Sequence, residues 1–346
     1  MTIKNKRLPA EWEPVGAILL SWPHGATDWN YMLDEVERCY VDIASAIIRH
    51  ARLIVVGPDG AHIRAKLAHL DSSRITVVEM ETNDTWARDF GVITTIDGDG
   101  MAHLNDFKFN GWGLKFAANY DNLITRRMID AGVLAGEYDN RLGFVLEGGS
   151  IESDGMGTIL TTSNCLLSPN RNGDLSREEI EAKLGEYLGA DRVLWIDHGD
   201  LVGDDTDSHI DTLARLVDKD TIIYVGCSDQ NDEHYDCLAE MKADILALRR
   251  ADGKPYNLVE LPLPDAVYDE DGLRLPATYA NFLIVNDAVL VPVYNQPAKD
   301  DLALKLVKIA FPAHEVVGID CNALIKQHGS LHCVTMQLPE AALKLD

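Results

Sequence analysis

The stretch VITTIDGDGMAHL, residues 92–104, decides the fold class. Two runs rich in β-branched and apolar residues flank the turn 97–100, which consists of aspartate and glycine, and this arrangement is typical of a β-hairpin. The same pattern recurs around the turns 153–157, 218–220 and 286–287. Hairpins that recur along one chain predict a repeated supersecondary unit, with insertions that make its spacing uneven.

Helical periodicity is present between the hairpins. Apolar residues with helical spacing occur in the segments 34–50, 177–188 and 233–250, which predicts helices there. Strand pairs that alternate with helices predict one α/β domain over residues 1–346, built from about five strand–helix modules around a centre. A doubly wound parallel sheet is the weaker alternative, because its crossovers join parallel strands whereas these hairpins are antiparallel.

Two more strand-like runs lie near the ends of the chain. Residues 17–22 and 331–338 are largely apolar, but neither has a hairpin partner beside it. Both runs are therefore expected to be strands whose partners lie elsewhere in the sequence.

The composition disfavours several classes of partner. The chain is 46% hydrophobic and has a net charge of −25, from 56 acidic and 31 basic residues. It can bury a large core, and its surface repels phosphate backbones and anionic lipids, so neither nucleic acid nor membrane is expected as a partner. The charge would attract a small cation, although maintaining solubility is the simpler explanation.

Expectations about location and cofactors rest on other features. Residues 1–14 contain no apolar stretch of signal-peptide type, and the apolar runs are short, so a cytoplasmic location is expected. The six cysteines are scattered without a CxxC pair, which argues against a disulfide framework and a structural zinc site. No glycine-rich nucleotide loop is recognisable. We expect no cofactor and no metal.

Polar clusters interrupt the apolar pattern at the hairpin ends, in residues 83–91, 146–150, 203–211 and 329–335. Cys333 lies in the last cluster, after a Gly-Ser turn and at the expected start of a strand. A cysteine in a strand is commonly an inert small hydrophobe, but a position at the end of a module also suits a nucleophile. Neighbouring strand residues point to opposite faces, so His332 is not expected to be the base for Cys333.

A histidine and several carboxylates form the second candidate set. His209 and Asp211 are one residue apart, so on a strand they would share one face. More aspartates precede them, a combination that suits a cation, but a metal is disfavoured because no second histidine stands at ligand spacing. Asp89 could simply pair with Arg88, and Glu147 could be an exposed turn residue. Together with His209, Asp211 and Cys333, however, these two would place three carboxylates, a histidine and a thiol at the ends of separate modules.

A guanidinium group matches this set of residues. It is planar and permanently cationic, and it donates paired hydrogen bonds that carboxylates accept. Its central carbon is a poor electrophile, so hydrolysis needs a soft, strong nucleophile held in line and an acid that expels ammonia. A cysteine and a histidine can supply these functions.

The polar clusters also resemble a known family, the agmatine deiminase branch of the guanidine-modifying superfamily, which includes bacterial-type peptidylarginine deiminases. The resemblance runs nearly end to end, through Trp22-Pro23-His24 and the segments 109–113, 165–172 and 329–333. It implies a five-bladed α/β propeller (pentein) with the active site on the central axis. The segment before the final cysteine has fewer glycines than is common in the family, which leaves the shape of that loop open.

The resemblance further implies a role for each residue. Cys333 would be the nucleophile and His209 the general acid/base. Asp89 and Asp211 would clamp the guanidinium nitrogens, and Glu147 would support His209. Neither a cofactor nor a metal is implied.

The activity implied by the resemblance is hydrolysis of agmatine to N-carbamoylputrescine and ammonia, toward putrescine and polyamines, through a covalent thiouronium intermediate. A deiminase of free or peptidyl arginine is the main alternative, but a substrate carboxylate needs a basic receptor, and the motifs offer chiefly Arg88 and Arg171. Trp86 and Asp205 could instead hold an aliphatic stem and an ammonium, which favours agmatine. An amidinotransferase and a non-catalytic cation-binding protein stay open, as does the oligomeric state, with a homodimer as one alternative.

The carboxylates also bear on ionisation. Negative charge around Cys333 predicts a thiol pKa above its ordinary value, so a bound guanidinium would promote thiolate formation. His209, beside the same carboxylates, is expected to be protonated at neutral pH. The alternative is a resident thiolate–imidazolium pair with a low thiol pKa.

Overall fold

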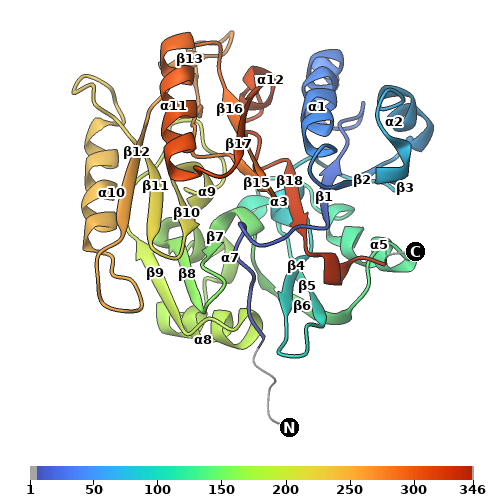
Figure 1. Ribbon diagram of the computed structural model, residues 1–346, viewed down its shortest axis with the longest axis horizontal. Helices are drawn as coiled ribbons and strands as arrows, with labels where there is room; N and C mark the ends of the chain where they lie inside the picture. Colours follow the sequence, from blue (N-terminus) through green and yellow to red (C-terminus); the bar gives the residue numbers. More distant parts are fainter. Residues whose placement is uncertain (1–5, 345–346) are drawn as a thin grey trace.

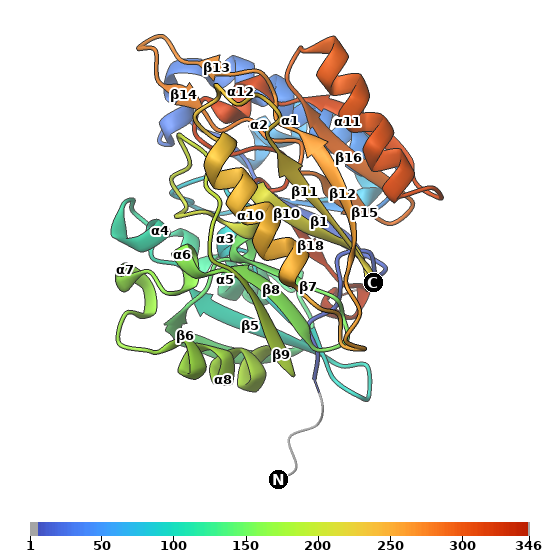
Figure 2. The same ribbon diagram turned by 90° about the vertical axis from the view of Figure 1, so that its left-hand side faces the viewer.

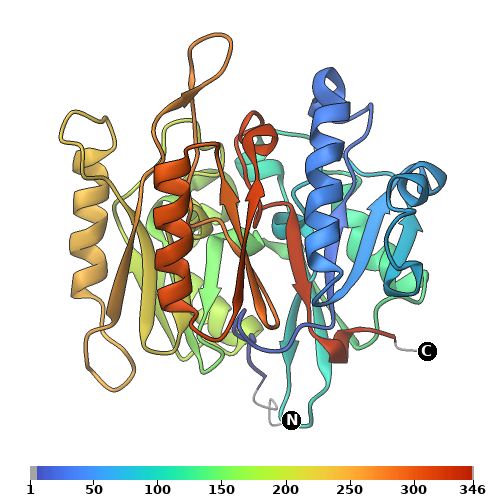
Figure 3. The same ribbon diagram turned by 45° about the horizontal axis from the view of Figure 1, so that its top comes forward.

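Five sheets stand around a common centre, with the long helices on their outer side (Figure 1, Figure 3). The computed structural model describes residues 6–344, so residues 1–5 and 345–346 of the expected domain lie outside the described part. This arrangement confirms the expected five-bladed α/β propeller, the pentein fold. Within the described residues, no helix combines the length and the apolar character needed to cross a membrane.

Each blade combines an antiparallel strand pair with a parallel neighbour. The sheets are β18–β1–β2–β3 (Thr335–Leu338, Ala17–Ser21, Arg52–Gly57, Ile75–Glu79), β4–β5–β6 (Ile93–Ile96, Ala102–Lys108, Glu137–Val145), β7–β8–β9 (Ile151–Ser153, Thr158–Thr162, Arg192–Ile196), β10–β11–β12 (Ala214–Asp218, Thr221–Gly226, Asn257–Pro262) and β15–β16–β17 (Leu283–Val285, Ala288–Val293, Glu315–Asp320). The crossover helices that join the parallel strands are α1 (Leu33–Ile47), α5 (Ile124–Asp130), α8 (Arg177–Leu188), α10 (Tyr235–Ala247) and α11 (Pro297–Ala310).

The four predicted hairpins are confirmed. They form the antiparallel pairs β4–β5, β7–β8, β10–β11 and β15–β16. The three predicted helices are also present, as α1, α8 and α10. The sequence marks α8 clearly, because a Ser176–Glu179 capping box begins it and Gly189, with φ of 74°, follows its last residue.

The two end segments pair with each other and close the ring. β1 runs antiparallel to β18, with Ala17 opposite Leu338 and Leu20 opposite Thr335. The expected strand 331–338 is only partly correct, because β18 begins at Thr335 and residues 331–334 form turns. The nucleophile candidate Cys333 therefore lies in a turn, where the chain enters the sheet from the axis.

A short helix, α2 (Gly60–Lys66), is the crossover between the parallel strands β2 and β3. Other short helices lie in the connections between strands. They are α3 (Ala87–Phe90), α4 (Gly111–Leu114), α6 (Ser163–Leu166), α7 (Pro169–Asn172), α9 (Ile210–Leu213) and α12 (Asn322–Ile325), and the small β13–β14 pair (Val267–Tyr268, Arg274–Leu275) lies in the connection between β12 and β15. In Figure 2, α4, α6 and α7 lie together at one edge, while α10 packs against β11.

A charged network around Glu11 fills the centre on one side of the ring. The Glu11 carboxylate accepts hydrogen bonds from Arg88 Nη1 at 2.9 Å and Gln337 Nε2 at 3.1 Å, and it lies 2.9 Å from His332 Nε2. It also pairs with the fully buried Arg215. The N-terminal segment is thereby joined to β10, to β18 and the turn before it, and to the segment Ala87–Phe90.

Candidate active site

Cys333 lies at the inner end of a cavity, in the turn that precedes β18. The cavity has a volume of about 480 Å³ including its open mouth, and it reaches the surface past aromatic and acidic side chains. The Cys333 thiol is 3.6 Å from Asp211 Oδ2 and 3.2 Å from Asn281 Nδ2, and Cys333 is almost wholly buried. A carboxylate and an amide are thus the thiol's closest polar neighbours.

Asp89 faces the same region from α3. Its Oδ2 accepts a hydrogen bond from Trp112 Nε1 at 2.8 Å, and its Oδ1 accepts one from the Gly149 amide at 3.0 Å. A β-carbon on Gly149 would lie 2.7 Å from His209 Nδ1 and 2.8 Å from Asp89 Oδ1, so this position has no room for a side chain. The alternative, that Asp89 simply pairs with Arg88, does not hold, because Arg88 turns away toward Glu11.

His209 is not on a strand. It immediately precedes α9, and Asp211 lies within that helix, so the argument that the two share a strand face is wrong. The loop before them is folded by Asp204, which accepts hydrogen bonds from Thr206 Oγ1 at 2.6 Å and from the Ser208 amide at 2.7 Å. Tertiary structure nevertheless brings His209 near Asp89, with 3.5 Å between Nδ1 and Oδ1.

His209 is fully buried, and neither ring nitrogen has a hydrogen-bond partner among the described residues. Burial lowers the pKa of His209 to about 3, and the attraction of Asp211 for a proton only partly opposes this effect. The expectation that His209 is protonated at neutral pH is therefore wrong for the pocket without substrate. Counting nearby carboxylates overlooked the cost of burying an imidazolium.

The surroundings of Asp211 favour its ionised form. Burial tends to raise its pKa, but the hydrogen bond from His332 Nδ1, at 2.7 Å, and nearby positive charges outweigh burial and lower it. Its other oxygen, Oδ1, has no hydrogen-bond partner among the described residues. Asp211 can therefore accept a hydrogen bond from a bound cation while His332 holds it in place.

Glu147 is fully buried and is not the exposed turn residue that the sequence allowed. Arg171 Nε donates hydrogen bonds to both of its oxygens, at 2.8 and 3.1 Å. Arg171 also binds Asp207 at 2.6 Å and the Thr206 carbonyl at 2.8 Å. Glu147 lies close to His209, but the link that positions it is to Arg171, whose role the sequence did not indicate.

The remaining predicted residues line the cavity. Trp86 and Asp205 belong to its wall, and the other lining residues are Asp28, Trp29, Asp84, Asp89, Trp112, Phe116, Thr206, Gln327, His328, Gly329 and Cys333. Burial, followed by repulsion from Asp28, raises the pKa of Asp84 to about 7. Among the described residues, the lining contains four aspartates and neither lysine nor arginine.

Thiol ionisation is disfavoured in this site. Burial raises the pKa of Cys333 well above its ordinary value, and the charges of Asp211 and Asp89 raise it further. The direction agrees with the expectation from sequence, although burial is the larger cause. A cation placed between these carboxylates would reverse part of the effect.

Three neighbours of the site were not apparent from the sequence. Asn281 contacts the thiol, Trp112 holds Asp89, and Cys165 lies beside His209 and Glu147. Asn281 interrupts an apolar run, which was a usable signal. Trp112 and Cys165 fall in segments of the family resemblance but have no chemical signature of their own.

A five-bladed α/β propeller with a cysteine, a histidine and carboxylates gathered near its centre is the arrangement that a pentein hydrolase of the amidine-cleaving class would have. The chain belongs to the Porphyromonas-type peptidyl-arginine deiminase family, whose sequence profile matches residues 7–339. It is therefore an enzyme of the deiminase type.

Relatives of this chain cover almost its whole length. Agmatine deiminases from Stutzerimonas stutzeri and Pseudomonas putida are 34% and 35% identical to it, each over 96% of this chain and 95% of the relative. A cysteine-to-serine variant of C. jejuni agmatine deiminase with substrate bound has a TM-score of 0.91 at 35% identity, covering 99% of both chains. A Porphyromonas gingivalis structure, provisionally named an arginine deiminase, has a TM-score of 0.93 at 55% identity, covering 98% of this chain and 100% of that one.

Proposed function

We propose that the protein is an agmatine deiminase, which hydrolyses agmatine to N-carbamoylputrescine and ammonia. The observation that carries this proposal is the composition of the cavity wall, where four aspartates occur and the described residues contribute neither a lysine nor an arginine. Agmatine is cationic at both ends. Its guanidinium would lie between Asp89 and Asp211, and its ammonium near the outer aspartates, of which Asp205 is the one expected from sequence.

In this proposal, the guanidinium supplies the charge that ionises the thiol. Cys333 attacks the guanidinium carbon, and a C–S bond forms as the C–N bond to ammonia breaks. His209, which burial keeps neutral, takes up the thiol proton and passes it to the departing ammonia. The same imidazole then removes a proton from water, which attacks the thiouronium and releases the ureido product. Glu147 supports His209 by its nearby charge.

Arginine is the competing substrate, in view of the family's description and the provisional name of the Porphyromonas gingivalis structure. Its carboxylate would need a cation near the outer end of the cavity. Arg171 is occupied by Glu147 and Asp207, and Arg88 by Glu11. Lys115 lies near this end, but Asp207 binds it at 2.7 Å. These pairings favour a substrate without a carboxylate.

The test is ammonia release from agmatine, free arginine and a blocked arginyl peptide, compared by kcat/KM. Agmatine should be preferred by about 100-fold or more, because an unpaired buried carboxylate costs several kcal/mol. Asp205→Asn should raise KM for agmatine with little change in kcat. A higher kcat/KM for arginine or the peptide would overturn the proposal and would point to Lys115 as the carboxylate receptor.

A further inference from the structure

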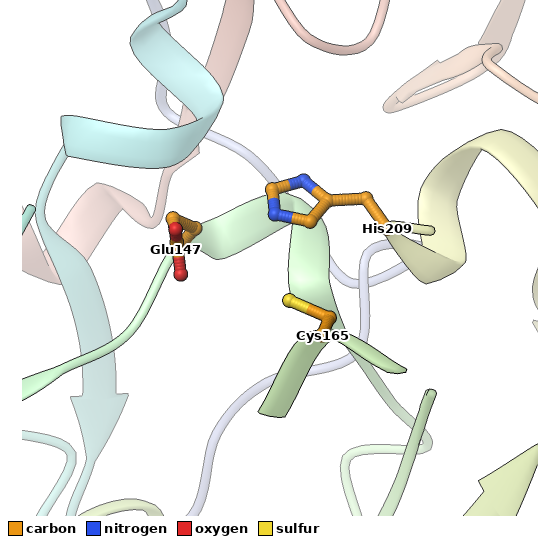
Figure 4. A group of neighbouring side chains, drawn as sticks. All are labelled: Glu147, Cys165 and His209. Atoms are coloured by element: carbon orange, nitrogen blue, oxygen red, sulfur yellow. The ribbon is translucent and has the colours of Figure 1, made fainter. Parts of the chain in front are cut away.

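Three buried side chains of different chemistry converge behind the thiol site. They are Glu147, which follows β6, Cys165 in α6, and His209, which precedes α9. Each is fully buried, and their ligand atoms all lie within 4.8 Å of one another. Figure 4 shows the three side chains pointing toward a common space. The reaction proposed above makes no use of Cys165.

The His209 imidazole is unusual for a buried side chain. Buried polar atoms are normally hydrogen-bonded, yet neither ring nitrogen of His209 has a partner among the described residues. One nitrogen, Nδ1, lies 3.5 Å from Asp89 Oδ1, so the other is left for Glu147 and Cys165. Glu147 also keeps acceptor capacity, because a single nitrogen of Arg171 serves both of its oxygens.

A thiolate, an imidazole and a carboxylate are a ligand set that suits Zn²⁺. In a tetrahedral zinc site, two ligand atoms lie about 3.4–3.6 Å apart, given the usual zinc–ligand lengths. The present cluster needs to contract only by roughly an ångström to reach this spacing. Asp89 beside Nδ1 and Arg171 beside Glu147 stand where outer partners orient metal ligands in known sites.

We propose that Glu147, Cys165 and His209 form an inhibitory Zn²⁺ site. The ion enters through the aspartate-lined substrate cavity, whose charge attracts cations, and a water completes its coordination. Cys165 loses its proton on binding. Inhibition rests on the proposed function of His209, because a metal-bound imidazole cannot transfer protons. The site regulates the enzyme and is not a catalytic metal centre.

Binding is tested with Co²⁺, which reports a sulfur ligand through a near-ultraviolet charge-transfer band. The experiment uses the inactive Cys333→Ser variant, so that the thiol at the cavity's inner end cannot supply the ligand. The band should appear in Cys333→Ser, disappear in Cys333→Ser/Cys165→Ser, and persist in the matched control Cys333→Ser/Cys237→Ser. The variant Cys333→Ser/Cys165→Ala repeats the test with a different substitution, and circular dichroism verifies the fold of each variant.

Two outcomes of the cobalt experiment would contradict the site. A band that is absent from Cys333→Ser would mean that Cys165 does not ligate the metal, and one that survives in the double variant would assign the sulfur ligand to another cysteine. A second group of ligand-type residues, His103, Glu137 and Asp139, is partly exposed and has no sulfur, so metal bound there gives no such band.

Inhibition is measured as the initial rate of ammonia release from agmatine at buffered concentrations of free Zn²⁺. Relative to its own uninhibited rate, Cys165→Ser should show an inhibition constant raised about tenfold or more, and Cys237→Ser should match the wild type. Equal inhibition of all three proteins would overturn the proposal. If agmatine is not a substrate, the cobalt band still tests the site, so failure of the function and failure of the site are distinguishable.

Discussion

At the scale of single residues, Cys333 combines a buried thiol with an amide and a carboxylate as polar neighbours. Cys333→Ser should abolish turnover without loss of fold, because a hydroxyl is a far weaker nucleophile toward the guanidinium carbon. Mass spectrometry of the quenched wild-type enzyme should show a substrate adduct on the peptide that contains Cys333. An adduct on Cys165 or Cys321 would contradict the assignment.

The raised pKa of the Cys333 thiol predicts how the residue reacts with alkylating agents. Only the thiolate reacts, and its fraction falls about tenfold for each pH unit below the pKa. Labelling of the free enzyme should therefore be slow at pH 7. A small, unreactive guanidinium should lower the apparent pKa and accelerate labelling, because it offsets the charges of Asp211 and Asp89. Fast labelling at pH 6 without a ligand would indicate a resident thiolate.

The two clamp candidates should each be costly to neutralise. Asp89→Asn or Asp211→Asn removes one charge from a buried charge-assisted pair with the substrate, so kcat/KM should fall by an amount equivalent to about 2–5 kcal/mol. The matched control is Asp287→Asn, which alters an exposed carboxylate remote from the cavity. A loss of less than about tenfold at either clamp position, which is below 1.4 kcal/mol, would mean that the carboxylate is structural.

At the scale of elements, α7 holds two neighbouring segments through Arg171, which binds Glu147 after β6 and Asp207 in the loop before α9. Arg171→Met leaves the Glu147 carboxylate buried without its cation. Such a loss costs about 3–5 kcal/mol in the free energy of unfolding, measured by urea denaturation.

The matched control for that variant is Arg177→Met. Arg177 pairs with Asp197 on the surface, where the two side chains are 36% and 48% exposed, and removing such a pair costs about 1 kcal/mol or less. The Arg171 variant should also show faster hydrogen exchange in residues 204–208. Equal losses in the free energy of unfolding for Arg171→Met and Arg177→Met would mean that the buried ion pairs of Arg171 do not stabilise the fold.

At the scale of the whole molecule, Glu11 joins the N-terminal segment to Arg88, Arg215 and His332. Glu11→Gln should cost about 3–5 kcal/mol in the free energy of unfolding, because two buried guanidinium groups lose their shared anion. Glu13→Gln is the control, since Glu13 pairs with the half-exposed Arg7 and should cost about 1 kcal/mol or less.

The contribution of Glu11 to the free energy of unfolding should decrease as the pH falls. Burial alone would raise the pKa of Glu11, but the charges of Arg88, His332 and Arg215 hold it well below its usual range. A lowered pKa in the folded state stabilises the protein above the unfolded value of about 4.3, and this stability is lost as pH falls through the folded value. The difference in stability between wild type and Glu11→Gln should therefore be constant near neutrality and shrink in acid.

The hairpins and helices were predictable from sequence because turn chemistry and periodicity act over a few residues. The Asp-Gly turn at 97–100 and the capping box before α8 are such local signals, and both elements form where expected. The sequence also singled out Cys333, His209 and the carboxylates as candidates, because residue type alone limits what a side chain can do. Local signals cannot, however, show which elements meet.

Only the tertiary structure decided the environment of each group. It paired the two ends of the chain as β1 and β18, placed Cys333 and His209 outside strands, and engaged Arg171 with Glu147. It also reversed the expected protonation of His209, because desolvation depends on everything packed around the ring and can exceed the attraction of nearby carboxylates. The sequence by itself determined the strands and helices of each blade and the types of reactive side chain. Long-range packing determined which partners those side chains contact and whether they are protonated.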